Sequence, residues 1–562
     1  MIEKIKKILN EVLNDSGFFQ VKDFEVKEPP PNINFEFSTN LPILISKKYN
    51  VLLEDVYNKI ENSINNNYKN IFIEINFTSP GFLNFNLDRN FYYEELKKIF
   101  FEKEEYPCLD KYKNKKVLVE FISANPTGPL HIGHGRCAVL GDVLSNILKK
   151  MGCEVYKEYY INDRGRQIDI LTASVVEVII LENLSEVEEE VFSWCRKVLV
   201  DSKYKGEYIK EISVEISKIF KKITLNEIEK IKTKIVELIM DNIKNTLKRM
   251  GIDFDSYLNE TELYKSGLNQ KIKNLLQEFG LIEEKEGALW VKAKNLGDEK
   301  DRVIIKSDGE PTYFFSDIIY HYYKIMRNYN WLINIWGTDH HGYVERLRGT
   351  VELISKKLEK EVKLDIILYQ LVSLITKNQR VSMSTREGRF ISLDEVLDEV
   401  GSDVTRFFLL TKSPNTHLDF DLELAKEHSL KNPVYYTQYA HTRCVGILKE
   451  ASNLEPNFSI EQYIDDFRDY ISNLDKTSYE FKLVKTLCVY SNVLEKCIEN
   501  FSPHYLCNYL IDLSKIFHKF YETTRVISSN KIDFCRLLLV VASKIILKNS
   551  LSLLNIQAPE KM

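Results

Sequence analysis

Apolar residues near the start of the chain follow a helical spacing, which later gives way to alternation. An amphipathic helix is predicted by apolar residues that recur every three or four positions: Ile5, Ile8, Leu9, Val12 and Leu13. Ile71–Phe77 and Phe82–Leu87 alternate between apolar and polar residues, and Ser79-Pro80-Gly81 between them predicts a turn. We therefore expect residues 1–105 to form an α+β domain, with the Lys/Glu-rich stretch 96–116 as a hinge.

From Lys116 the pattern becomes that of an α/β fold. Val117–Ile122 is a short apolar run typical of a buried parallel strand. Apolar residues at helical spacing occupy 138–148, and Glu154–Ile161 predicts the next strand. This succession predicts a right-handed crossover unit in a parallel sheet. Ligands bind such sheets at the carboxyl ends of the strands, so the loop after Ile122 is the expected site.

The rest of the chain divides into three stretches. Residues 170–275 are charged with helical apolar spacing, which predicts an insertion between two halves of the sheet. The α/β pattern resumes with Arg302–Lys306, Trp331–Trp336 and the helix after His341. Residues 431–562 predict a helical bundle with an irregular joint at 453–459 and no strand. The second predicted domain therefore covers 106–430, with the insertion inside it.

Composition narrows the class of protein. The 562 residues are 44% hydrophobic and 28% charged, which is ordinary for a globular protein and excludes a disordered or collagen-like chain. The net charge of −5 gives no global positive field, so any nucleic acid must be bound by local basic patches.

The location of the protein is also indicated by its sequence. Nine cysteines without a Cys-x-x-Cys pair are typical of reduced thiols, and the first residues are charged where a secretory peptide would be apolar. The apolar stretch Leu537–Ile556 is interrupted by Lys544 and Lys548, which favours a buried helix over a membrane span. We expect a cytoplasmic protein that does not enter a membrane.

The loop after the first sheet strand carries the clearest chemistry. It contains His131-Ile132-Gly133-His134-Gly135, at the start of a predicted helix. Histidines at i and i+3 can face one ligand, and a helix N-terminus attracts phosphate. Gly133 and Gly135 leave room for adenine or ribose. The loop is therefore predicted to bind the α-phosphate of ATP. A purely structural helix cap and a zinc pair are the alternatives.

In context, this loop resembles that of a class I aminoacyl-tRNA synthetase, and more narrowly that of an arginyl-tRNA synthetase. The resemblance is carried by segments spread over most of the chain, in the order of the family: Val119–Leu130, Tyr160–Ile168, Tyr204–Tyr208, Trp336–Tyr343 and Pro559–Met562. It implies a Rossmann-type α/β catalytic domain with a helical insertion, an α+β N-terminal domain and an all-α C-terminal domain.

The second class I signature is expected between a late strand and a helix, where Gln379–Arg389 stands. Ser382 and Thr385 replace the two lysines of the general Lys-Met-Ser-Lys-Ser pattern, as arginyl enzymes often do. By resemblance, Met383, Ser384, Thr385 and Arg386 contact ATP, and Arg386 joins His131 and His134 in catalysis. Arg380, Arg389 and Lys377 are other possible sources of the missing charge.

Arginine offers a planar, permanently charged fork of five N–H donors. Its pocket needs a carboxylate with an aromatic face nearby, and Tyr313 and Asp317 lie four residues apart on a predicted helix. The resemblance implies that both bind arginine, that Glu120 and Asn125 take its α-ammonium group, and that His341 contacts a substrate. Structural roles for Tyr313 as a core aromatic and Asp317 as a helix cap stay open.

The resemblance also implies the partners: L-arginine, ATP with Mg²⁺ as its complex, and tRNA(Arg), with no metal held by the protein itself. We expect a monomer. The C-terminal domain would read the anticodon, with an aromatic and basic cluster suited to unpaired bases: Tyr435, Gln438, Tyr439 and Arg443. The same cluster also fits an internal helix-packing stripe. The N-terminal domain would contact the tRNA elbow.

Three other functions are considered. A class I enzyme for cysteine, glutamate or glutamine would keep the chemistry, although a cysteinyl enzyme ordinarily has zinc-binding cysteines. A synthetase-like RNA-binding protein without activity is suggested by Ser382 and Thr385. A small-molecule adenylyltransferase would leave the helical C-terminal domain without a purpose. The arginyl function, Arg + ATP + tRNA → arginyl-tRNA + AMP + pyrophosphate, is favoured over all three.

Overall fold

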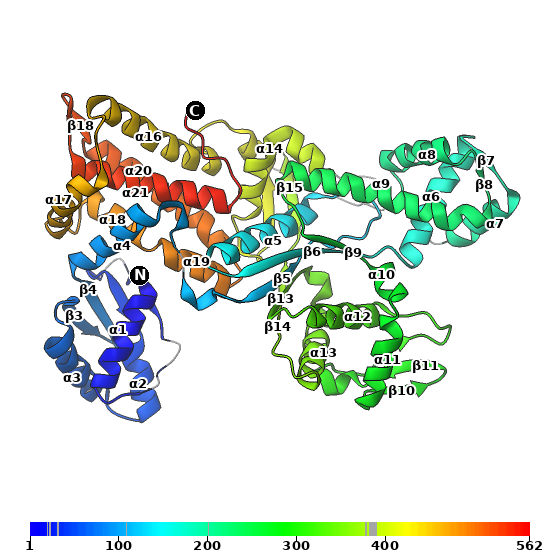
Figure 1. Cartoon of the computed structure of the whole chain (residues 1–562), viewed down its shortest axis with the longest axis horizontal. Coiled ribbons are helices and arrows are strands. Elements are labelled where there is room, and N and C mark those ends of the chain that lie inside the picture. Colours follow the sequence, from blue (N-terminus) through cyan, green and yellow to red (C-terminus); the bar gives the residue numbers. More distant parts are fainter. Residues whose placement is uncertain are drawn as a thin grey trace.

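A central parallel sheet connects an N-terminal α+β unit, a helical arm and a C-terminal helical bundle (Figure 1). The computed structural model describes residues 1–19, 21, 24–30, 33–107, 109–200, 202–376, 379–380 and 391–562. In Figure 1 the arm of α6–α9 extends to the right, and the N-terminal unit lies below the bundle on the left.

The N-terminal unit places helices on an antiparallel sheet of order β1-β2-β4-β3. Its elements are α1 (Ile2–Asp15), β1 (Val26–Lys27), β2 (Phe37–Thr39), α2 (Leu41–Tyr49), α3 (Leu53–Ser63), β3 (Phe72–Thr78) and β4 (Phe82–Leu87). The predicted first helix and the two predicted strands are confirmed, and the five apolar positions of α1 are buried.

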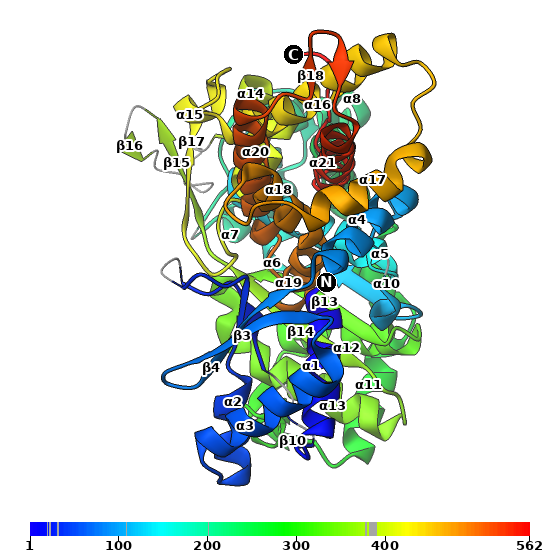
Figure 2. The ribbon, with the colours of Figure 1, turned by 90° about the vertical axis from the view of Figure 1, so that its left-hand side faces the viewer.

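The predicted hinge at 96–116 is wrong over its first part. Helix α4 (Arg89–Glu102) packs against the C-terminal bundle beside α17 (Figure 2). Tyr92 meets Phe481 with ring centroids 5.4 Å apart, and Phe100 meets Phe467 at 5.6 Å. The Lys and Glu residues lie between buried apolar positions at helical spacing, so burial of one face determines the structure here.

The central sheet has the order β14-β13-β5-β6-β9, with every pair parallel. The predicted crossover unit is confirmed as β5 (Lys116–Glu120), α5 (Ile132–Lys150) and β6 (Glu154–Ile161). Strand β5 stops two residues earlier than predicted, because Ile122 and Ser123 turn the chain with φ of +68° and +38°. Positive φ is costly for a β-branched residue, and such strain is typically found at functional sites.

The arm leaves the sheet after β6. It consists of α6 (Arg166–Leu181), β7 (Glu186–Val187), α7 (Glu189–Val198), α8 (Glu207–Ile219), β8 (Lys222–Ile223) and α9 (Ile228–Arg249). The predicted insertion of 170–275 is too long, because β9 (Ser256–Asn259) returns to the sheet and pairs with β6. Four residues between charged helices give too little pattern for a strand to be recognised from sequence.

A second, antiparallel sheet follows α10 (Glu260–Lys265) and α11 (Leu268–Glu278). It contains β10 (Ile282–Lys285), β11 (Ala288–Val291) and β12 (Arg302–Ile305). The strand predicted at Arg302–Lys306 is therefore present but lies outside the parallel sheet. The chain returns to that sheet through α12 (Tyr313–Met326), β13 (Trp331–Gly337), α13 (Val344–Lys357) and β14 (Lys363–Tyr369).

The last part of the catalytic half contains β15 (Val372–Thr376), β16 (Gln379–Arg380), α14 (Leu393–Leu409), β17 (Leu418–Asp421) and α15 (Leu422–Lys426). Helix α14 packs against α5. Arg136 of α5 is 1% exposed and donates to the carbonyls of Gln370, Ser413 and Thr416 at 2.8–2.9 Å, which fixes α5 to this part of the chain.

The C-terminal bundle is confirmed. It contains α16 (Pro433–Leu454), α17 (Ile460–Ser472), α18 (Tyr479–Cys488), α19 (Tyr490–Glu499), α20 (His504–Thr523) and α21 (Phe534–Leu553). The predicted joint at 453–459 separates α16 from α17, whereas the short hairpin of β18 (Ile527–Ser528) and β19 (Lys531–Ile532) was not predicted. Helix α21 is largely buried, and within the described ranges no helix is both long and apolar enough to span a membrane.

A buried ionic cluster joins these parts, and we name it the Asp142 cluster: Asp142 of α5, Lys157 of β6 and Arg406 of α14. Asp142 accepts from Arg406 at 2.5 Å and from Lys157 at 3.2 Å. Arg406 also donates to the carbonyls of Met250, after the arm, and Leu554, after α21. All three side chains are nearly or fully buried.

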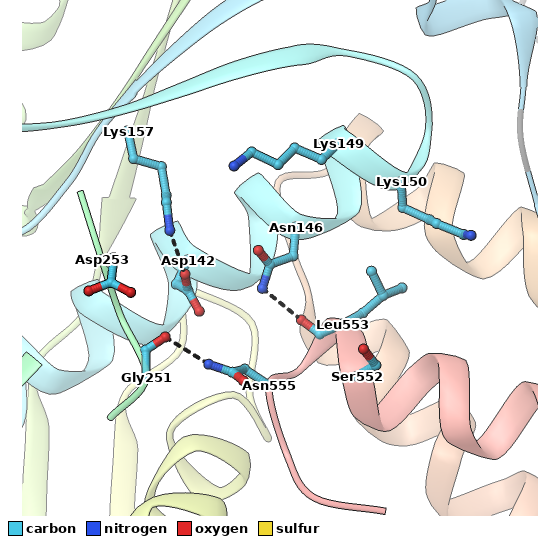
Figure 3. Close-up of a pocket in the computed structure, with 10 residues that line it drawn as sticks. All are labelled: Asp142, Asn146, Lys149, Lys150, Lys157, Gly251, Asp253, Ser552, Leu553 and Asn555. Atoms are coloured by element: carbon cyan, nitrogen blue, oxygen red, sulfur yellow. Dashed lines mark hydrogen bonds and ion pairs between the residues drawn. The ribbon is translucent and has the colours of Figure 1, made fainter. Parts of the chain in front are cut away.

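Figure 3 shows the surroundings of this cluster, a pocket of about 400 Å³ between α5, the end of the arm and the end of α21. Asn146 donates to the Leu553 carbonyl at 3.1 Å, and Asn555 donates to the Gly251 carbonyl at 2.7 Å. These bonds therefore join the arm, the sheet and the bundle to one another around α5.

We predict that Asp142→Asn strongly destabilises the protein, because Arg406 and Lys157 would lose their buried counter-charge. Removal of one partner from a buried pair costs about 3–5 kcal/mol. Thermal and urea unfolding measure the effect. Glu215→Gln is the control, since the Glu215–Lys218 pair is exposed and should matter by less than about 1 kcal/mol. Equal stability of the two variants would contradict the role of the cluster.

Candidate active site

Two histidines cap the N-terminus of α5. The Nδ1 atom of His131 accepts the backbone N–H groups of Gly133 at 3.1 Å and His134 at 3.3 Å. The Nδ1 atom of His134 in turn accepts the backbone N–H of His131 at 3.4 Å, and the two rings stack with centroids 3.7 Å apart. The structural cap considered from the sequence is therefore present.

This cap also determines what the rings can offer a ligand. Because each Nδ1 accepts a hydrogen bond, each neutral ring carries its proton on Nε2. Burial lowers the pKa of His131, and burial together with His131 lowers that of His134 well below its usual value. Both rings are neutral at pH 7 and present Nε2–H donors beside the positive end of a helix dipole, which suits a phosphate.

The two glycines of this loop have roles in packing. A Cβ on Gly133 would lie 2.9 Å from the His131 ring, so glycine is needed for the cap itself. Gly135 is buried, and a Cβ there would lie 2.9 Å from the Leu393 side chain. Packing of α14 on α5 thus accounts for Gly135, whereas the sequence had predicted that this glycine leaves room for the nucleotide.

The start of α14 lies beside the histidines. The backbone N–H of Leu393 donates to the Leu130 carbonyl at 2.8 Å, and His131 forms a β-bridge with Ser392. The predicted residues of the second signature, Met383, Ser384, Thr385 and Arg386, lie outside the described residues. The segment that contains them is followed directly by this contact with the α5 N-terminus.

Three carboxyl groups lie close together where strands of the central sheet end: Glu120 of β5, Glu260 after β9 and Asp317 of α12. We call this cluster of side chains the acidic pocket. Burial, followed by the charges of Glu120 and Glu260, raises the pKa of Asp317 to about 8. The pKa of Glu260 is also raised, mainly by burial. The burial of Asp317 beside the charges of Glu120 and Glu260 suits this place to a cationic ligand.

Aromatic and hydroxyl groups surround these carboxyls. Ser316 donates to Glu260 at 2.7 Å and lies 2.9 Å from the Tyr264 hydroxyl. The rings of Tyr160 and Tyr320 stack with centroids 4.3 Å apart. Within the part of the chain that the structure describes, the buried Tyr160 hydroxyl makes no close hydrogen bond, and burial, followed by the charges of Glu260 and Asp317, raises its pKa. A polar group that faces the pocket without a partner is available to a ligand.

The sequence-predicted binding residues divide into two groups. Glu120 and Asp317 are brought together, and Tyr313, 58% exposed, lies one helical turn before Asp317 on α12. Asn125 is exposed and donates to Gln167 at 2.8 Å. His341 is exposed in the 3-10 segment Thr338–Tyr343, which follows β13 at the same edge of the sheet.

Sequence reasoning missed Glu260 and Tyr160. Glu260 follows β9, and the sequence had assigned the residues of β9 to the helical insertion. No strand end was therefore expected at this position. Tyr160 lies within a segment cited only for its resemblance to a family. A strand end in the α/β pattern at 256–259 is the signal that would have identified Glu260 as a ligand candidate.

The cluster predicted to bind RNA lies on α16 and is bonded internally. Gln438 donates to Asp403 of α14 at 2.9 Å and to the Gln557 carbonyl at 3.0 Å, so its amide joins the bundle to the catalytic half. Arg443 donates to the Tyr439 hydroxyl at 2.9 Å and lies 4.5 Å from the Tyr521 ring centroid. Tyr435 is half-buried near the start of the helix.

Comparisons with known proteins all match the chain to the same family. Three family profiles match: "tRNA synthetases class I (R), catalytic domain" at 95–421, "DALR anticodon binding domain" at 437–562 and "Arginyl tRNA synthetase N terminal domain" at 3–87. An arginine–tRNA ligase of Aquifex aeolicus is 37% identical and covers 100% of this chain and 99% of its own length. That of Carboxydothermus hydrogenoformans is 36% identical, covering 97% and 96%.

One solved structure shows the same fold. Thermus thermophilus arginyl-tRNA synthetase aligns over 100% of both chains with a TM-score of 0.75 at 21% identity.

The double cap at His131 leads to a prediction about stability. Asparagine keeps a side-chain acceptor at an N-cap and alanine does not, so His131→Ala should lose about 0.5–2 kcal/mol whereas His131→Asn should lose much less. Thermal unfolding of the two variants, compared with the parent, measures the difference. An equal loss in both variants would mean that the cap does not stabilise α5.

Proposed function

Because the chain belongs to the arginyl-tRNA synthetase family, we propose which of its residues bind the substrates and promote the reaction. The protein is an aminoacyl-tRNA synthetase that joins arginine to tRNA. The predicted fold class is confirmed: a Rossmann-type class I catalytic domain between an α+β N-terminal domain and an all-α C-terminal domain. The observation that carries the residue assignments is the acidic pocket beside the capped helix.

Arginine occupies the acidic pocket. Its guanidinium group pairs with Asp317 and Glu260, since a carboxylate can accept two parallel N–H donors from the guanidinium fork. Tyr313 covers it from the preceding turn of α12. Glu120 and Asn125 take the α-ammonium group, and His341 contacts the substrate from the end of β13. The raised pKa values of Asp317 and Glu260 support this arrangement, because burial disfavours both carboxylates and a bound cation would favour them.

ATP lies along the N-terminus of α5. The arginine carboxylate attacks the α-phosphorus, the bond to the β-phosphate oxygen breaks, and pyrophosphate leaves. The Nε2–H groups of His131 and His134 donate to the α-phosphate oxygens as their charge grows. Because the carboxylate is already ionised, no general base is needed. The adenylate is then attacked by a terminal ribose hydroxyl of the tRNA, and AMP leaves.

The second signature completes the ATP site in this proposal. Met383, Ser384 and Thr385 line the nucleotide, and Arg386 neutralises phosphate charge. The contact between Leu393 and Leu130 supports it, because the described residues that follow this segment lie beside the histidines. Mg²⁺ enters with ATP and offsets phosphate charge. Within the described residues, no group of three or more His, Cys, Asp or Glu side chains is placed to hold a metal ion.

The flanking domains bind tRNA(Arg). The bundle, with Tyr435, Gln438, Tyr439 and Arg443 on α16, reads the anticodon, and residues 1–105 contact the elbow of the tRNA, while 106–430 carry the catalysis. We further propose a monomer in the cytoplasm. Every proposed site residue comes from one chain, and the described cysteines are unpaired and mostly buried.

Aminoacylation of total tRNA with each of the twenty amino acids tests the function, alongside pyrophosphate exchange with and without tRNA. We expect charging with arginine alone. Charging with glutamate, glutamine or cysteine would overturn the assignment of the pocket. Retained tRNA binding without charging by any amino acid would favour an inactive RNA-binding protein and direct attention to Ser382 and Thr385.

The acidic pocket predicts a pH dependence. The pKa of Asp317 in the empty site is raised to about 8, so a proton must leave before a guanidinium can pair with it. The KM for arginine should therefore fall as the pH rises through about 8, while the KM for ATP changes little. Asp317→Asn should raise the KM for arginine and remove this dependence. An unchanged profile in the variant would assign the titration to another group.

The two roles of His131 can be separated. His131→Asn keeps a cap acceptor but has no Nε2–H donor, so it should retain stability and lower the rate of pyrophosphate exchange by about 10²–10³-fold. Stability and rate are measured on the same preparation. A stable variant with an unchanged rate would leave His131 as a cap alone.

A further inference from the structure

A buried chain of polar side chains lies beneath the acidic pocket, and the mechanism above does not use it. It consists of His321 and Lys324 of α12 and Asn334 of β13, all 0% exposed. It begins at the backbone carbonyl of Asp317 and ends at the carboxylate of Glu120. We call these three residues the buried relay.

The bonds of the relay are short and continuous. The Nδ1 atom of His321 lies 2.8 Å from the Asp317 carbonyl, and its Nε2 lies 2.8 Å from the amide nitrogen of Asn334. Lys324 donates to the Asn334 amide oxygen at 3.0 Å and to Glu120 Oε2 at 2.6 Å. Asn334 and Glu120 are neighbours in register on paired strands.

Only one direction of donation satisfies every atom. A carbonyl can only accept, so His321 carries its proton on Nδ1, and its Nε2 accepts from the Asn334 amide. The amide oxygen is thereby turned toward Lys324. Burial, and then the charge of Lys324, lowers the pKa of His321 well below its usual value, so the ring stays neutral. Lys324 also lies 4.0 Å from the Tyr320 ring centroid.

The relay leaves Glu120 with a fixed orientation. Lys324 binds one oxygen of its carboxylate, and Ser123 donates to the other at 3.0 Å. Ser123 is itself held by the backbone N–H of Tyr160 at 3.1 Å. A carboxylate has about four acceptor positions, so two remain for a ligand. Because Lys324 already pairs with Glu120, Asp317 and Glu260 are the carboxyl groups left to pair with the guanidinium group.

Stability alone does not account for such a pair. A buried ion pair is often no more stabilising than apolar residues of similar size, since both charges lose their hydration. The defined hydrogen bonds of Lys324 instead fix the orientation of the Glu120 carboxylate. We propose that His321, Asn334 and Lys324 are positioning residues that hold Glu120 in place for the α-ammonium group of arginine and thereby set the affinity for it. This rests on the proposed function of Glu120.

The probe for this role is 5-guanidinopentanoate, which is arginine without its α-amino group. In the parent enzyme, arginine should bind more tightly than the probe because of Glu120. The measured quantity is the ratio between the inhibition constant of the probe and the KM for arginine in pyrophosphate exchange. Disordered packing would weaken both ligands alike, whereas a misplaced Glu120 would weaken arginine alone.

Lys324→Met should lower this ratio by about tenfold or more, with the KM for ATP unchanged, because a charged hydrogen bond is lost with the orientation of Glu120. Lys157→Met is the matched control, since Lys157 is also a buried lysine paired with a buried carboxylate, Asp142. It should lower stability and leave the ratio as in the parent. Equal ratios in the two variants would overturn the proposal.

Asn334→Asp tests the relay without changing side-chain volume. It gives Lys324 a second carboxylate and removes the donor to His321, so the ratio should fall here as well. If Lys324→Met does not fold, this variant decides: a ratio equal to that of the parent overturns the proposal. A parent enzyme that charges tRNA with another amino acid would instead overturn the proposed function and leave the relay without a role in arginine binding.

Discussion

The ion pair between Asp142 and Arg406 fixes the position of α5, and the active site depends on that position. Asp142 lies in the middle of a helix whose first turn carries His131 and His134. Arg406 reaches from α14 to the carbonyls that end the arm and the C-terminal bundle. Arg136, two residues after His134, is bonded to three further carbonyls. The first turn of α5 is therefore held by parts of the chain that are remote in sequence.

The site combines two opposite electrostatic environments on one sheet. Neutral imidazole donors and a helix N-terminus face the expected phosphate position, whereas carboxyl groups gather a short distance away at the ends of β5 and β9. Two buried carboxylates beneath the site have cationic partners: the buried Lys324 pairs with Glu120, and the half-buried Arg327, together with the Tyr320 hydroxyl, binds Glu158. In the function proposed above, the cationic ligand therefore pairs with Asp317 and Glu260, whose pKa values burial raises.

The sequence predicted those features whose residues follow one another closely along the chain. The first turn of α5 was recognised because strand, loop and histidines follow one another within 20 residues, and the helices of the bundle carry long apolar patterns. Glu260 was missed because β9 has four residues. The second half of α4 was taken for part of a hinge because Lys97, Lys98 and Glu102 begin a charged stretch that continues to Lys116. Arg406, Asn334 and Lys324 are recognisable only in three dimensions, since each has a partner more than ten residues away or on another element.

The return of the chain at β9 has a consequence for variation in this protein. Strands β6 and β9 are neighbours, with Tyr159 opposite Tyr257, so the arm leaves and re-enters the sheet at adjacent positions. The two ends of the arm are thus held at adjacent positions by the pairing of β6 and β9, whatever the length of the arm between them. Each doubling of the length of an inserted segment costs only about 0.6 kcal/mol in chain entropy. Its helices are therefore free to gain or lose turns in the course of evolution while the strand ends below them keep their spacing.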